Sequence, residues 1–368
     1  MSKFDYLLIE EIPMKQSLRI ILDLAKVAGI VALGVFARTT GAAPAVTCPG
    51  PTTIGGLPGA RFHDGSFGVK GPLAVNPDGA KASYTRGDHG FTYVSNGMDL
   101  FNPKASCQSR GSDCSKKFRE AEARGFGQGT PEFCVYAIEV EPIPPKTATI
   151  DCGNGKKVIG NGKGRPRVGE DQLDTVDGGK TSYYVSMTRL NQLLGGKVRP
   201  IDSAMVPSIV VPTGEPNLVG RVVYVAYQGR DTLAVAGDTG PRFGEGSIAL
   251  HEMLRYGGLQ TPPKIGPISL SCRCGEEERA LKPPFEARPD FRGDRCAQGV
   301  GQRGAADIRA YAGIDNGVTM VVLGKASLPM KSAVSQVPVT LDALREAADK
   351  AGYTDASLKA MASCLEQR

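Results

Sequence analysis

Four consecutive segments rich in β-branched and aromatic residues, in the middle of the chain, most strongly constrain how this protein can fold. They are Ser182–Met187, Ser208–Val211, Gly220–Tyr227 and Asp231–Ala236. Gln228-Gly229-Arg230 predicts a tight hairpin turn between the last two segments. We therefore expect a β-rich core in which a buried strand leads directly to Asp238.

The segment that follows, AGDTGPRFGEGSIALHEML (residues 236–254), places two carboxylates on glycine-rich backbone. The glycines allow sharp turns and leave space around Asp238 and Glu245, so that a polymeric substrate could approach both. Such a pair can hydrolyse a glycosidic bond, with one carboxyl protonating the leaving oxygen and the other activating water. The same pattern also fits a tight turn capped by Asp238 and a helix start whose dipole interacts with Glu245. Ser247–Arg255 predicts that short helix.

This motif resembles the hallmark segment of glycoside hydrolase family 75, the chitosanase family, and especially its bacterial members, which read roughly GD-x-GP…GE-x-SIAL. Further segments resemble the same family in the same order: YVSNGMDL (Tyr93–Leu100), TSYYVSMTRL (Thr181–Leu190), VPSIVVP (Val206–Pro212) and VTMVVLGKASLPM (Val318–Met330). Together the segments cover most of residues 90–330.

The resemblance implies an endo-acting hydrolase of a β-1,4-linked amino-sugar polymer such as chitosan, with Asp238 and Glu245 as the catalytic pair. The family inverts the anomeric configuration, which implies carboxyls separated by about 6.5–9.5 Å to admit a water molecule. No cofactor and no metal are expected. The substrate-binding residues expected beside the pair are Asp99, Tyr184, Thr239 and Ser247.

The local surroundings of the two acids give an expectation for their roles. Asp238 follows the apolar segment Leu233–Ala236, and burial raises the pKa of a carboxyl. Glu245 precedes a helix whose N-terminal dipole favours a carboxylate. The sequence therefore predicts Asp238 as the general acid and Glu245 as the general base.

The chain departs from the fungal members of the family in two places. Only Thr239–Gly244 separates the two acids, where fungal members carry a longer aspartate-rich insert, and Asp99 is followed by Leu100–Pro103 instead of an aspartate-rich DCDG. Both departures remove negative charge that would suit a polycationic substrate.

Two alternatives therefore stay open. One is a peptidoglycan-cleaving lytic enzyme that uses Asp238 alone, because Val235–Gly240 is also similar to a turn of membrane-bound lytic transglycosylases. The other is a non-catalytic wall-binding protein on the same fold. The similarity to the transglycosylase turn suggests a double-psi-like barrel.

The rest of the chain predicts an exported protein. Residues 1–45 resemble a signal peptide, with basic residues before the apolar run Val27–Ala37 and a small-x-small cleavage site at Ala43-Pro44-Ala45. The mature protein would be secreted or periplasmic, monomeric, and without stable membrane insertion.

Composition divides the mature chain further. The Gly- and Pro-rich residues 46–83 predict an extended arm. The catalytic domain is expected over residues 84–335, with a Cys- and Pro-rich insertion at 261–312, and capped amphipathic helices over 336–368. The predicted fold class is α+β and β-rich, with a barrel-like sheet core, a short helix after the acid motif and two C-terminal helices.

Nine cysteines in an exported chain predict disulfide bonds. We expect Cys107 to pair with Cys114, and Cys134 with Cys152. A third group, whose pairing stays open, consists of Cys272, Cys274, Cys296 and Cys364. No second close pair or nearby His completes a tetrahedral zinc site around these cysteines.

Composition also narrows the partners. The 44 Lys and Arg residues are scattered among 38 Asp and Glu, and no basic run alternates with aromatic residues, so we do not expect a nucleic acid partner. The chain contains no Trp. Any surface that stacks on sugar rings would have to come from tyrosines: Tyr93, Tyr183, Tyr184, Tyr224 and Tyr227.

Overall fold

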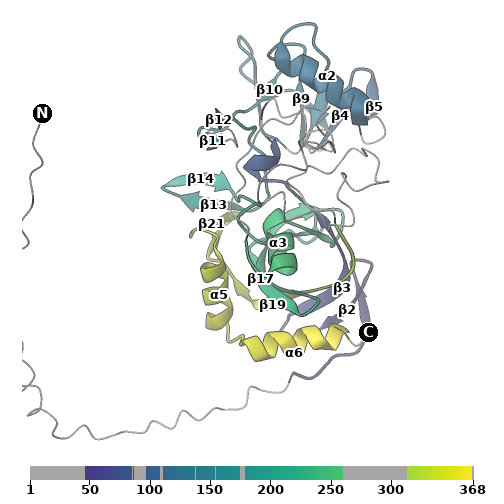
Figure 1. Ribbon diagram of the computed structural model, residues 1–368, viewed down its shortest axis with the longest axis vertical. Coiled ribbons are helices and arrows are strands. Elements are labelled where there is room, and N and C mark those ends of the chain that lie inside the picture. Colours follow the sequence, from purple (N-terminus) through teal and green to yellow (C-terminus); the bar gives the residue numbers. More distant parts are fainter. Residues whose placement is uncertain are drawn as a thin grey trace, which may run out of the picture. The chain divides into compact units, whose positions relative to one another are not determined.

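The computed structural model describes residues 46–84, 86, 97–107, 111–136, 138–153, 155–174, 179–259 and 313–366. The predicted signal peptide and the predicted insertion lie outside these residues, as do Tyr93, Cys272, Cys274 and Cys296. The described residues form an α+β fold in which strands predominate, as predicted (Figure 1).

The core is an eight-stranded sheet, six strands of which close into a barrel. The strand order is β1-β2-β3-β18-β15-β17-β16-β19, and β19 also pairs with β3, which closes the ring. Two neighbouring pairs, β15 with β17 and β3 with β18, are parallel. The strands are β1 (Thr52–Ile54), β2 (Leu57–Arg61), β3 (Phe67–Val75), β15 (Ser208–Pro212), β16 (Arg221–Tyr227), β17 (Arg230–Gly240), β18 (Glu245–Gly246) and β19 (Ile314–Ser327).

The turn between β16 and β17 forms where the sequence predicts it. Gln228 and Gly229 have φ angles of 47° and 78°. Positive φ at both central residues is typical of the two-residue turns that match the twist of a hairpin. Strands β15, β16 and β17 thus confirm three of the four predicted central strands.

The barrel strands are buried on both faces because each face contacts a different core. In β16, Val223 and Val225 lie in the core inside the barrel, whereas Val222 and Tyr224 lie in a second core outside it. This alternation follows from the two-residue period of a strand. Leucines of helix α3 (Ile248–Tyr256) contribute to the inner core, and Figure 1 shows α3 at the opening of the barrel.

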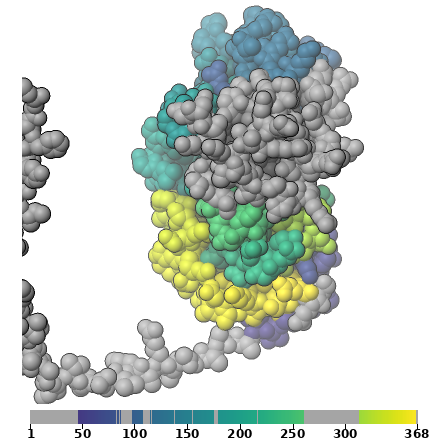
Figure 2. All heavy atoms as spheres, viewed as in Figure 1, coloured from purple at the N-terminus to yellow at the C-terminus, as the bar shows by residue number. Residues whose placement is uncertain are grey.

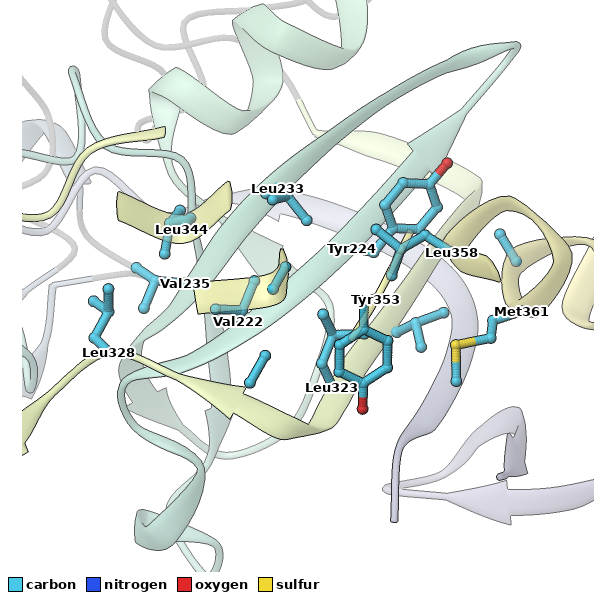
Figure 3. Close-up of a cluster of buried hydrophobic side chains, with 14 of the residues drawn as sticks. Val222, Tyr224, Leu233, Val235, Leu323, Leu328, Leu344, Tyr353, Leu358 and Met361 are labelled. Atoms are coloured by element: carbon cyan, nitrogen blue, oxygen red, sulfur yellow. The ribbon is translucent and has the colours of Figure 1, made fainter. Parts of the chain in front are cut away.

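The outer core packs the two C-terminal helices, α5 (Leu341–Lys350) and α6 (Asp355–Glu366), against the barrel. Figure 3 shows Leu344 and Leu358 of these helices facing side chains of β16 and β17. In Figure 2 the yellow C-terminal residues border the green residues around α3. The side chain of Thr340 accepts a hydrogen bond from the Ala343 N–H, so α5 has the predicted N-cap.

A third core joins helix α2 (Gly111–Ala123) to a five-stranded sheet of order β5-β4-β6-β9-β8. Tyr84, Tyr184 and Ile248 also belong to this core, so it is continuous with the residues around α3. The sheet strands are β4 (Met98–Phe101), β5 (Lys104–Ser106), β6 (Phe133–Val135), β8 (Asp151–Gly153) and β9 (Lys156–Ile159).

The remaining elements are short strands, which form small sheets, and two 3-10 helices. They are β7 (Val140–Glu141), β10 (Arg165–Pro166), β11 (Leu173–Asp174), β12 (Lys180–Thr181), β13 (Asn191–Leu194), β14 (Lys197–Pro200), β20 (Met330–Lys331), β21 (Val334–Ser335) and the 3-10 helices η1 (Lys81–Tyr84) and η2 (Pro216–Leu218).

Two predictions about secondary structure were wrong. Residues 46–83 are not an extended arm, because they contain β1, β2 and β3, and β3 is an integral strand of the barrel. Ser182–Met187 is not a regular strand and makes isolated bridges, at Tyr183, Tyr184 and Ser186. Three of the glycines and prolines that suggested an arm, Gly68, Gly71 and Pro72, lie within β3, which packs closely against its neighbours.

Three disulfide bonds connect described cysteines. Cys107–Cys114 and Cys134–Cys152 confirm the two predicted pairs. Cys364 pairs with Cys48, so it does not belong to the C-terminal group in which the sequence placed it. This bond joins the first described residues to α6. Within the described part of the chain, no helix is long and apolar enough to cross a membrane.

Candidate active site

Asp238 lies near the end of β17, directly after a β-bulge. Ile209 of β15 pairs with Ala236, whereas Val210 pairs with Asp238, so Gly237 is the extra residue. Ala236 faces the barrel interior, and without the bulge Asp238 would do the same. The bulge places Asp238 on the outer face, with Val210. A Cβ atom at residue 237 would lie 2.8 Å from neighbouring side-chain atoms, so the bulge requires glycine.

Three donors hold the carboxylate of Asp238. Its Oδ1 accepts the backbone N–H of Arg189 at 3.0 Å and that of Thr239 at 2.8 Å. The side chain of Asn76 also hydrogen-bonds to it. Burial raises the pKa of Asp238, and these hydrogen bonds oppose the rise because they stabilise the ionised form.

Glu245 lies on the same outer face, two strands away. It belongs to β18, which pairs with β3 at Ala74 and with β15 at Ile209. This register places Glu245 and Asp238 on opposite sides of Val210. Because neighbouring strands lie about 4.8 Å apart, the two backbones are separated by about 10 Å. Both side chains can therefore face one substrate across Val210.

The electrostatic surroundings of Glu245 differ from those of Asp238. Burial raises the pKa of Glu245, the negative charge of Asp238 raises it further, and the charge of the exposed Arg242 opposes this rise. Asp238 therefore has the donors that stabilise a carboxylate, and its charge helps to keep Glu245 protonated. This favours the opposite of the roles expected from the sequence.

A third carboxyl, Asp78, belongs to the same group. It follows β3, and its side chain accepts a hydrogen bond of 2.5 Å from the hydroxyl of Tyr84. Burial raises the pKa of Asp78 to about 7, and the charges of Asp238 and Glu245 contribute to the rise. Asp78 was not predicted as a site residue because it lies in the predicted arm, although the sequence Asn76-Pro77-Asp78-Gly79 is typical of a turn.

Asp99 lies beside this group through Tyr136. The charges of Asp99, Asp78 and Glu245 all raise the pKa of the Tyr136 hydroxyl, after the larger effect of burial. The Tyr136 ring lies 4.6 Å from the ammonium of Lys156, which is 3.5 Å from the Asp99 carboxylate. Tyr136 is 42% exposed and was not predicted. Asp99, Lys156 and Tyr136 thus form a polar and aromatic surface next to the carboxyls.

The structure separates the four predicted substrate-binding residues into two pairs. Thr239 and Asp99 lie at the site, and both side chains are partly exposed. Tyr184 and Ser247 are 2% and 1% exposed, so their side chains do not reach the surface of the site. The Tyr184 hydroxyl donates to Glu122 at 2.6 Å inside the third core, and its ring packs against Phe118.

The Ser247 hydroxyl is hydrogen-bonded to the backbone around it. Its Oγ accepts the N–H groups of Ser208 and Leu250 at 2.9 and 3.1 Å, and donates to the carbonyl of Val206 at 2.9 Å. It caps α3 and ties that helix to β15. Among the other tyrosines considered for stacking, Tyr183 and Tyr224 are also buried.

Comparisons with known proteins leave the family open. No family matches the chain, and no curated protein is similar to it at a significant level. The resemblance to glycoside hydrolase family 75 therefore rests on the motif residues. In the described part of the chain, no group of three or more His, Cys, Asp and Glu residues is arranged to hold a metal ion.

Proposed function

We propose that this protein is an exported glycoside hydrolase that cleaves within a β-1,4-linked amino-sugar polymer, with Glu245 as general acid and Asp238 as general base. The observation that carries the proposal is that two carboxyls lie on one face of the barrel in surroundings that favour different protonation states. Asp238 is held by donors that favour the carboxylate, and Glu245 has a raised pKa to which the charge of Asp238 contributes. Hydrolysis needs one protonated and one ionised carboxyl.

In the proposed reaction, Glu245 donates its proton to the glycosidic oxygen as the bond from that oxygen to the anomeric carbon breaks. Asp238 accepts a proton from a water molecule whose oxygen bonds to the anomeric carbon from the opposite face. Inverting enzymes hold their two carboxyls about 6.5–9.5 Å apart to admit that water. Asp238 and Glu245 extend from backbones about 10 Å apart, which is compatible with such a separation. The reducing end should therefore form with inverted configuration.

The charges around the site support a cationic substrate. The carboxylates of Asp238 and Asp99 lie at one place beside Tyr136, and their negative charge would attract the ammonium groups of a glucosamine polymer. Asp99 already pairs with Lys156, so a substrate ammonium would compete with that lysine. Three disulfides support a protein that folds in an oxidising compartment, such as the periplasm or the extracellular medium.

The test compares Asp238→Asn and Glu245→Gln with the wild type on chitosan. Each substitution should lower kcat/KM by about 10²–10⁴-fold while the protein remains folded, because each removes a proton-transferring group. Asp151→Asn is the matched control, since Asp151 is an exposed carboxylate paired with Lys157. It should leave activity unchanged. A loss below tenfold in both site variants would refute the assignment.

A substrate with an activated leaving group tests the roles. Such a leaving group needs no protonation, so Glu245→Gln should regain activity on it and Asp238→Asn should not. The opposite pattern would make Asp238 the acid.

Peptidoglycan, assayed in parallel, separates the alternatives. Cleavage of peptidoglycan alone, abolished by Asp238→Asn but not by Glu245→Gln, would indicate a lytic enzyme with one catalytic aspartate. Cleavage of neither polymer by the wild type would indicate a wall-binding protein.

A further inference from the structure

Asp78 is placed at the site by a turn that also contacts Asp238. The backbone N–H of Asp78 donates to Oδ1 of Asn76 at 2.8 Å, and the side chain of Asn76 hydrogen-bonds to Asp238. The backbone N–H of Asn76 donates to the carbonyl of Gly246, next to Glu245. One short segment after β3 therefore contacts both acid-bearing segments.

We propose that Asp78 is a positioning residue for the reaction: it holds an exchangeable proton beside Asp238 and Glu245, and its turn orients Asp238 through Asn76. The effect on the reaction rests on the proposed function, but the proton does not. Since Tyr84 donates to Oδ1 of Asp78, the exchangeable proton resides on Oδ2. The charges of Asp238 and Glu245 both help to keep this proton on Asp78, so Asp78 stays neutral as Glu245 loses its own proton.

The groups that face Asp78 come from several elements. Asp238 of β17 and Glu245 of β18 raise its pKa, and the Tyr84 hydroxyl lowers it. The charge of Asp78 also raises the pKa of the Tyr136 hydroxyl. The charge of Arg189 lowers the pKa of Asp238, and the charge of Arg242 lowers the pKa of Glu245. Because burial and the two acids outweigh the single hydroxyl, Asp78 binds its proton more tightly in the folded protein than in the unfolded chain.

This tighter binding gives a test that does not depend on enzymatic activity. Between the unfolded pKa near 4 and the folded pKa of about 7, the folded state holds one more proton, so stability should fall as the pH rises. Urea unfolding from pH 4.5 to 8 should show this fall in the wild type. In Asp78→Asn the fall should be smaller. In Tyr84→Phe it should extend to higher pH, because the hydrogen bond that lowers the pKa of Asp78 is lost.

A matched Tyr–Asp pair elsewhere in the chain serves as control. The Tyr353 hydroxyl donates to Asp64 at 2.6 Å, but the pKa of Asp64 is lowered. Its contribution to stability is present above the unfolded pKa and is lost only as the pH falls below it. Asp64→Asn should therefore shift stability equally from pH 5 to 8. A pH dependence of stability that Asp78→Asn leaves unchanged would overturn the proposal, whatever the enzymatic activity.

The kinetic readout is the pH profile of kcat/KM on chitosan. Asn76→Ala removes the side-chain hydrogen bond that lowers the pKa of Asp238, so the acidic limb, which reports Asp238, should move to higher pH. In Asp78→Asn this limb should stay in place, because Asp78 is neutral there. An acidic limb that Asn76→Ala leaves in place would overturn the positioning of Asp238 through Asn76. A wild type inactive on chitosan would refute the proposed function but leave the stability test valid.

Discussion

Replacing Ser247 with Ala tests whether this residue serves the fold or the substrate. The Ser247 hydroxyl satisfies two buried N–H groups and one carbonyl while being 1% exposed. Losing a helix N-cap costs about 0.5–2 kcal/mol. Leaving the buried N–H of Ser208 without its acceptor costs about 1–3 kcal/mol more. We therefore expect Ser247→Ala to lower the free energy of unfolding by roughly 2–4 kcal/mol.

Thr340→Ala provides the matched control for this variant. Thr340 also caps a helix, but it is exposed and accepts a single hydrogen bond, from the Ala343 N–H at 3.1 Å. Its loss should cost about 1 kcal/mol. The assay is the urea midpoint at unchanged m-value, together with KM for the polymer. Equal destabilisation of both variants, or a raised KM in Ser247→Ala at unchanged stability, would refute the structural role.

Two further outcomes follow from particular contacts. Tyr136→Ala should raise KM several-fold and leave kcat near the wild-type value. Tyr136→Phe should retain most affinity, because the exposed ring and not the hydroxyl would contact the sugar. Equal losses of affinity in both variants would contradict this. Replacing Cys48 and Cys364 together with Ser should destabilise the protein more than replacing Cys107 and Cys114, because the bonds span 316 and 7 residues and the chain-entropy estimates are at most about 6 and about 2 kcal/mol. Equal shifts in the urea midpoint would argue against this chain-entropy origin.

Local sequence patterns predicted the elements whose folding depends on near neighbours. Helices α3 and α5 begin where Ser247 and Thr340 supply N-caps, and the β16–β17 hairpin turns at Gln228-Gly229. The two short-range disulfides also follow from sequence spacing. Each of these features is determined by residues less than about twenty positions apart, so a pattern along the chain contains the information.

The error over residues 46–83 has a physical cause. Glycine in a strand usually weakens it, which made FGVKGPLAV resemble an arm. In the folded protein, a Cβ atom at Gly68 would lie 2.4 Å from the side chain of Leu365, and one at Gly71 would lie 3.0 Å from Leu57. The glycines of β3 therefore permit close packing. The partner that requires the first of them is nearly three hundred residues away, so the sequence alone could not show it.

The roles proposed for the acids could not be predicted from sequence for the same reason. The Asp238 carboxylate is held by Arg189 and Asn76, which are distant in sequence, and Glu245 is affected by the charge of Asp238 across an intervening strand. Neighbours in sequence suggested the reverse assignment. The geometry around a titrating group decides its pKa, and for Asp238 much of that geometry comes from the turn after β3 and from the segment before β13.

Carboxyls elsewhere in the same chain show what a purely structural acid looks like. Glu132 pairs with Lys163 and Asn161, and Asp171 pairs with Lys81 and Tyr183; the pKa values of both are lowered. Asp78, Asp238 and Glu245 have raised pKa values, as does Asp202, for which burial is the largest cause.

A carboxyl whose pKa rises on folding lowers the stability of the folded state at pH values above its unfolded pKa. Three such groups meet around one short turn after β3, where they lower the stability of the barrel at neutral pH. Perturbed pKa values of this kind concentrate at functional sites. The proposed catalysis would account for this arrangement, whereas a purely structural role would favour pairing each acid with a cation.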